Sequence, residues 1–122
     1  MRVSLNIPAT SATLSAALEG LTAVNFCLLK KSRKMPALYS SGVRYKREAP
    51  GTEEWLTAPQ VLAAGTGDCE DLSAWRAAEL RLLGIPARAV VVRTGAKRYH
   101  AVVLLPNGTY EDPSKKLGMR TA

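Results

Sequence analysis

The stretch that most constrains this chain is 65–72, Gly-Thr-Gly-Asp-Cys-Glu-Asp-Leu, in which a cysteine stands where a glycine turn becomes a helix. Asp68 is a good N-cap residue, and Asp71 at the third helical position completes a capping box with aspartate in place of the usual glutamate or glutamine. The free N–H groups and the dipole of a helix N-terminus favour a thiolate. The stretch therefore predicts either a reactive Cys69 or an inert, buried thiol at the start of a capped helix.

Helical patterns precede and follow this turn. Apolar residues recur every three or four positions over 10–31 and again over 69–83, and Gly84 provides the stop of the second helix. Between them we expect mostly loop, with a short helix or turn at 53–56 and a second short helix at 57–62. The sequence thus places Cys69 at the first turn of its clearest helix.

Three runs rich in β-branched residues follow the second helix. They lie at 87–93, 99–105 and 109–112, and turn residues separate them. Such spacing indicates an antiparallel meander. Helices first and a meander afterwards predict an α+β fold. We expect one domain over 1–122, with an N-terminal helix and basic loop region at 1–52 and a core at 53–117.

Composition limits the class of protein. A chain of 122 residues with 47% hydrophobic and 22% charged residues is typical of one soluble globular domain. Its two cysteines are too few for a disulfide framework, so we expect two thiols in a reducing compartment, with Cys27 buried inside an apolar run. The N-terminus has no signal-peptide apolar core, and no run reads as long enough to span a membrane. These features predict a cytoplasmic protein that does not bind membranes.

The net charge of +7 is concentrated in the first fifty residues. The basic runs are Lys30-Lys31-Ser32-Arg33-Lys34 and Arg44-Tyr45-Lys46-Arg47. Such runs bind nucleic acid or another polyanion, or they form the solvated C-terminal end of a helix, which also favours cations. The charge leaves both interpretations open, and we favour the second.

A catalytic cysteine needs a histidine to take its proton and a third group to hold the imidazole. The only histidine is His100, at the start of a predicted strand, and Asp112 ends the next strand. A two-residue turn between these strands would place His100 and Asp112 on opposite faces, whereas a three-residue turn places them on the same face. The alternatives are a core histidine and an aspartate that starts a turn before Pro113. Gln60 is either a side-chain donor to an oxyanion or a solvated helix residue.

Four motifs together resemble the core of transglutaminase-like cysteine enzymes over 53–117. They are Gly67-Asp68-Cys69-Glu70-Asp71, Leu83-Gly84-Ile85-Pro86-Ala87-Arg88-Ala89-Val90, His100-Ala101-Val102 and Asp112-Pro113-Ser114. The resemblance implies a papain-like fold in which the helix of the nucleophile packs on a small antiparallel β-sheet. It implies Cys69 as nucleophile, His100 as general base and acid, and Asp112 as the residue that orients the imidazole. The Cys69 N–H and Gln60 would then be the oxyanion donors.

The implied activity is hydrolysis or acyl transfer at an amide carbonyl of a protein or peptide, with no cofactor and no metal. The compact size is similar to that of small members encoded by bacteriophages and prophages, which implies the host cytoplasm or a virion as location and phage structural proteins as partners. The alternatives are a catalytically idle binding or assembly protein on the same fold and a basic polyanion-binding domain. Cys69, His100 and Asp112 are also metal-ligand types, although no close ligand pair supports a metal site. Glu70 and Asp71 would raise the thiol pKa unless a protonated His100 lies close.

Overall fold

The computed structural model describes residues 2–4, 11–32, 34–47, 54–95 and 98–120. Its helices are α1 (Ser11–Lys31), α2 (Ala58–Ala64), α3 (Cys69–Leu82) and α4 (Pro113–Lys116), with a short 3-10 helix η1 at Leu38–Ser40. Its strands are β1 (Arg2–Ser4), β2 (Arg44–Tyr45), β3 (Glu54–Leu56), β4 (Thr66–Gly67), β5 (Arg88–Gly95), β6 (Arg98–Leu104) and β7 (Tyr110–Glu111). The predicted α+β fold is confirmed, and so are both long helices and the meander. Residue 10, expected at the start of the first helix, and residues 96–97, within the turn expected between the first two strands, lie outside the described residues.

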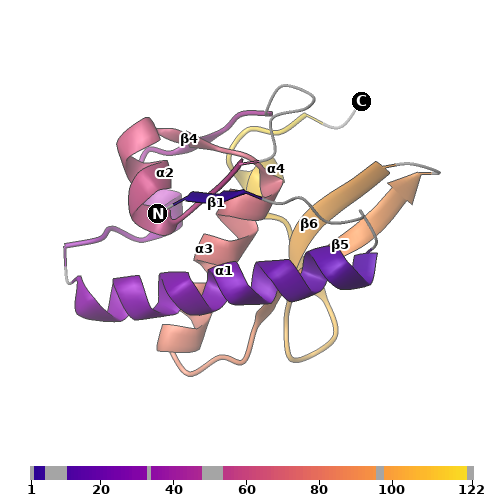
Figure 1. Ribbon diagram of the computed structural model, residues 1–122, viewed down its shortest axis with the longest axis horizontal. Helices are drawn as coiled ribbons and strands as arrows, with labels where there is room; N and C mark the ends of the chain where they lie inside the picture. The colour runs from indigo at the N-terminus through magenta and orange to yellow at the C-terminus, as the bar shows by residue number, and fades with distance from the viewer. Residues whose placement is uncertain (1, 5–10, 33, 48–53, 96–97, 121–122) are drawn as a thin grey trace.

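Helix α1 lies along one side of the molecule, with the β5–β6 hairpin near its N-terminal end and α2 near its C-terminal end (Figure 1). It packs against α3 and β5. The buried side chains between these elements include Leu18, Leu21, Ala77 and Val103, and a second cluster around Trp75 lies beneath η1 and α2. Apolar residues at helical and strand spacing thus bury α3 from both sides and fix where its first turn lies.

Helix α1 corrects two expectations from the sequence. Cys27 is exposed and not buried, because the spacing of Leu18, Leu21 and Asn25 turns the opposite side of the helix toward the core. Helix α1 is also long and apolar enough to cross a membrane by length and composition over Ala12–Lys31. The core helix of a soluble protein passes the same test, so this finding is weak evidence for a membrane span.

Two small sheets connect parts of the chain that are far apart in sequence. Strand β1 pairs antiparallel with β3, and β2 pairs parallel with β4. The expected helix or turn at the start of the core is therefore wrong for residues 54–56. These residues form an extended segment because their partners come from the N-terminus and because the N–H of Leu56 donates to Asp71 Oδ1 at 2.8 Å. The β2–β4 pair holds the turn that precedes Cys69.

Strands β5, β6 and β7 form the antiparallel sheet that the sequence predicts. In β6 and β7, Val103 pairs with Glu111 and Leu104 pairs with Tyr110. The turn closes with the N–H of Leu105 donating to the carbonyl of Thr109, which leaves residues 106–108 as a three-residue loop. This is the register that places His100 and Asp112 on the same face of the sheet.

Candidate active site

The first turn of α3 holds Cys69 through the predicted capping box. Asp68 is the N-cap in extended conformation, and its N–H donates to Asp71 Oδ2 at 3.1 Å, while its own carboxylate accepts from the backbone of the first turn. Gly67 allows the close approach of this turn to the helix, because an added Cβ would lie 3.0 Å from Leu72 Cδ2 and 3.1 Å from Val61 Cγ1. The residues next to Cys69 in the sequence therefore determine the backbone conformation around the thiol.

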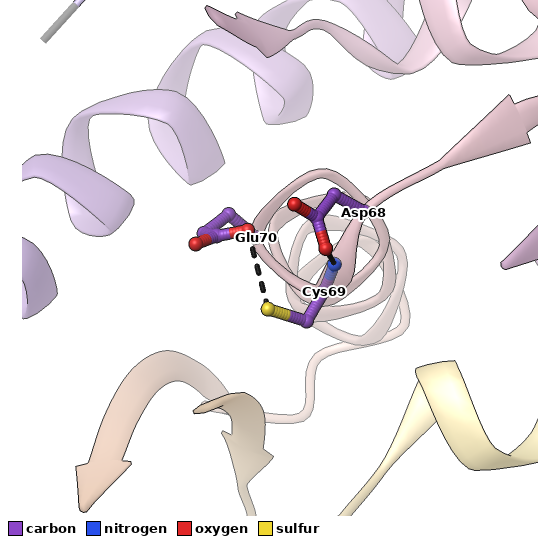
Figure 2. A group of neighbouring side chains, drawn as sticks. All are labelled: Asp68, Cys69 and Glu70. Atoms are coloured by element: carbon purple, nitrogen blue, oxygen red, sulfur yellow. Dashed lines mark hydrogen bonds between the residues drawn. The ribbon is translucent and has the colours of Figure 1, made fainter. Parts of the chain in front are cut away.

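The thiol is buried among negative charges. Cys69 is 8% exposed, and its Sγ donates to Glu70 Oε2 at 3.2 Å (Figure 2). Burial raises the pKa of the Cys69 thiol, and the carboxylates of Glu70 and Asp68 raise it further. The backbone amide of Ala101 hydrogen bonds to the sulfur and opposes this shift. Burial and the neighbouring carboxylates therefore favour the protonated thiol over the thiolate.

Glu70 resembles the thiol in this respect. Its pKa is raised from its ordinary value, first by burial and then by the charge of Asp68, while the nearby His100 acts in the opposite direction. Among the residues that the structure describes, no Lys or Arg forms an ion pair with Glu70 or Asp68. The set of charges around the sulfur thus differs from the expected one in one member: Asp68 contributes, whereas the Asp71 carboxylate forms the capping box.

His100 and Asp112 are brought together by the sheet. His100 Nε2 lies 2.7 Å from Asp112 Oδ2, and the two side chains are 12% and 18% exposed. The other oxygen of Asp112 accepts from the N–H of Lys115 at 3.3 Å and caps α4. A carboxylate only accepts hydrogen bonds, so Nε2 is the nitrogen that donates and Nδ1 is left as the basic nitrogen of the neutral ring.

The structure joins the predicted residues in two pairs. His100 contacts Asp112, and Cys69 contacts Glu70; among the described residues the thiol donates to this carboxylate and not to the imidazole. The pairs meet at β6, where Ala101 follows His100 and its amide reaches the sulfur. The arrangement can orient an imidazole beside a protonated thiol.

Both residues expected to stabilise an oxyanion make other hydrogen bonds, Gln60 through its oxygen and Cys69 through its N–H. Gln60 Oε1 accepts from the N–H of Thr57 at 3.0 Å and from its hydroxyl at 3.1 Å, which closes the capping box of α2. The N–H of Cys69 donates to Asp68 Oδ1 at 2.7 Å. The amide nitrogen of Gln60 remains the part of that side chain suited to an oxyanion, so its role stays a prediction.

Sequence reasoning missed Tyr45 as a neighbour of the thiol. Burial raises the pKa of its phenol to about 12, and the carboxylates of Asp68 and Glu70 contribute to that shift. Only the β2–β4 pairing brings Tyr45 beside the turn, since Tyr45 pairs with Gly67. No local sequence signal reveals a contact of this kind.

The cluster of possible metal ligands also differs from the one weighed in the sequence. The ligand atoms of Asp68, Cys69 and Glu70 lie within 4.8 Å of one another. Asp68 Oδ1 is already committed to the helix N-terminus, and the sulfur carries its proton. We assign no metal to this group, and the expected absence of a metal stays a prediction.

Comparison with known proteins identifies a matching protein family. The family model described as "Transglutaminase-like superfamily" matches residues 22–109, which is more than half of the chain and includes both Cys69 and His100. The match begins inside α1 and ends before Asp112. No curated protein and no solved structure matches the chain. The expected phage origin therefore stays a prediction.

Proposed function

The chain belongs to the transglutaminase-like superfamily, a family of cysteine-dependent enzymes, and from that premise we propose that it performs acyl transfer at an amide carbonyl. In this proposal Cys69 is the nucleophile, His100 is the general base and acid, and Asp112 orients the imidazole. A protein or peptide supplies the carbonyl. The single observation that carries the proposal is the 2.7 Å hydrogen bond between His100 Nε2 and Asp112 Oδ2. His100 lies on β6, and the backbone amide of the next residue, Ala101, interacts with the Cys69 sulfur.

The proposed reaction starts with a proton transfer. His100 Nδ1 takes the proton of the Cys69 thiol, and the thiolate attacks the carbonyl carbon, so that a C–S bond forms and an oxyanion develops. The imidazolium then gives its proton to the leaving nitrogen as the C–N bond breaks. Water or an amine attacks the thioester, loses its proton to His100, and releases the acyl group. Asp112 holds the ring in the tautomer that this cycle needs.

Glu70 opposes the first step of this proposal. It accepts a hydrogen bond from the thiol and its negative charge favours the protonated sulfur. A substrate that displaces this contact would release the thiol toward the imidazole, and catalytic hydrogen bonds commonly tighten only when substrate is bound. We therefore expect the resting thiol to be alkylated slowly at neutral pH.

The direct test uses p-nitrophenyl acetate as an acyl donor. Cys69 should release p-nitrophenol in a burst and gain the mass of one acetyl group, and a peptide map should place the acetyl on Cys69. In a Cys27→Ser background, Cys69→Ala should abolish the burst, and His100→Ala should slow it by about 100-fold or more. A glycine ester added as acceptor separates hydrolysis from amide formation. A burst that persists in Cys69→Ala, or that His100→Ala leaves unchanged, contradicts the proposal.

The protonated thiol also favours a second candidate, a catalytically idle binding or assembly protein on the same fold. That candidate predicts no burst in any variant and unchanged assembly in Cys69→Ala. The exposed cations Lys30, Lys34, Lys46 and Arg47 similarly favour a polyanion partner. Affinity for DNA that does not fall with rising salt would remove that partner.

A further inference from the structure

A charged cluster lies immediately beside the residue proposed to orient the imidazole. Glu111 precedes Asp112 in the chain, and its Oε2 accepts from Arg76 Nε at 2.6 Å and from the Tyr39 hydroxyl at 2.5 Å. The side chains of Arg76 and Glu111 are only 21% and 13% exposed. The strand β7 that carries Glu111 is two residues long, so these contacts add substantially to its attachment.

The cluster connects β7 to the helix that carries the nucleophile. Arg76 lies seven residues after Cys69, which is about two turns along α3. Its guanidinium also lies 4.8 Å from the centre of the Tyr39 ring and donates to Glu79 Oε1 at 3.2 Å. Glu79 Oε2 in turn accepts from the N–H of Leu38 at 2.6 Å. Three elements, α3, η1 and β7, are therefore joined by one set of mutually oriented groups.

The charge of Glu111 is matched by that of Arg76. Burial acts to raise the pKa of Glu111, but the hydrogen bonds from Arg76 and Tyr39 outweigh it and lower that pKa below its ordinary value. Glu111 is thus an ionised acceptor held by two donors, one of which is a guanidinium. Charge-assisted hydrogen bonds of this kind are short and directional, and they restrict the backbone that bears them.

We propose that Arg76, Glu111 and Tyr39 form a positioning cluster that fixes Asp112, and through it His100, relative to Cys69. The inference rests on the proposed function, because it assumes that His100 takes the thiol proton. None of the three residues touches the reacting atoms. They act by fastening the β7 end of the sheet to α3, and small displacements of a catalytic group have large effects on rate.

The test compares two ion pairs on the same helix. Glu111→Gln and Tyr39→Phe weaken the positioning cluster, whereas Glu19→Gln removes the partner of Arg81, whose Nη2 lies 2.6 Å from Glu19 Oε2. All variants carry Cys27→Ser, so that iodoacetamide reports on Cys69 alone. Rates are measured well below the melting temperature of each variant. His100 is the only histidine, so its imidazole gives an unambiguous NMR signal for the Nε2–H bonded to Asp112.

We expect Glu111→Gln to slow alkylation of Cys69 by about fivefold or more. The Nε2–H signal of His100 should broaden or disappear through exchange with water, and Tyr39→Phe should give a smaller change of the same kind. Glu19→Gln should leave both the rate and the signal as in the parent. If Glu111→Gln does not fold, Tyr39→Phe decides by the same two measurements.

Two failures are distinguishable. If His100→Ala does not slow alkylation, the proposed function fails and the positioning role fails with it. If His100→Ala slows alkylation while the variants of the positioning cluster behave like Glu19→Gln, the inference is overturned and the proposed function stands.

Discussion

Two parts of helix α3 differ in whether the charged side chains there are paired with opposite charges. At the N-terminal end, Cys69 lies between the carboxylates of Asp68 and Glu70, and among the described residues no Lys or Arg pairs with either. Further along, Arg76 and Arg81 are each paired with a glutamate at 2.6 Å. Matched pairs stabilise a scaffold, whereas partly buried acids without a cationic partner oppose folding and are retained where chemistry needs them. The contrast separates the candidate site from the structure that supports it.

The largest expected effect comes from breaking the scaffold part of α3. Trp75 is fully buried, so Trp75→Ala should cost about 3–5 kcal/mol of unfolding free energy, measured by urea denaturation. Trp75→Phe is the matched variant, because it keeps a ring and deletes an Nε1–H that has no partner among the described residues. It should cost much less. Equal losses would mean that the helix is not anchored through the ring.

Neutralising Glu70 at the N-terminal end of α3 should instead increase the reactivity of the Cys69 thiol. Glu70→Gln removes a charge that raises the thiol pKa, so alkylation of Cys69 at neutral pH should be about tenfold faster, equal to one pKa unit. The measurement is the iodoacetamide rate as a function of pH in the Cys27→Ser background. Glu19→Gln, which removes a carboxylate of the same charge from the ion pair with Arg81, is the control. An unchanged or slower rate in Glu70→Gln would show that this carboxylate assists the thiol.

The contributions of Glu111 and Glu70 to the free energy of unfolding should also change with pH in opposite directions. The pKa of Glu111 is lowered in the folded protein, so its contribution is fully present above the ordinary value of 4.5 and is lost as pH falls through the folded pKa. The pKa of Glu70 is raised, so its contribution is present below 4.5 and is lost as pH rises through the folded pKa. Denaturation of Glu111→Gln and Glu70→Gln across this range should therefore show opposite trends relative to the parent. Parallel trends would contradict the contrast.

The smallest effect is expected at the outer ion pair. The Glu19 side chain is 41% exposed, so Glu19→Gln should cost about 0.2–1 kcal/mol, and less in high salt. Thermal melting at low and high salt measures this cost. A salt-insensitive loss larger than that would place Glu19 among the structural residues of the core.

Local rules predicted much of this structure. The capping box of Asp68 and Asp71, the glycine turn before the thiol and the two long strands all depend on residues close in sequence. The three-residue turn at 106–108 places Asp112 on the same face of the sheet as His100. The sequence indicated that the face depends on the length of this turn, but it did not determine which of the two lengths occurs.

Contacts between distant segments could not be predicted in the same way. The β1–β3 and β2–β4 pairs join segments far apart in the chain, and they turned an expected helix into a strand and brought Tyr45 beside the thiol. The exposure of Cys27 depends on which side of α1 faces α3, which an apolar run alone leaves ambiguous. The partner of Arg76 likewise follows from the docking of β7, since a helical arginine carries no local sign of its acceptor.

Asp112 links the imidazole to the segment that follows β7. One of its oxygens holds the imidazole and the other begins α4, whose next residues return to β2 where the carbonyl of Leu117 accepts from Tyr45. The segment 113–117 therefore supports the position of the imidazole. A proteolytic cut within 113–117 would loosen the imidazole although the site of the cut lies outside the catalytic residues.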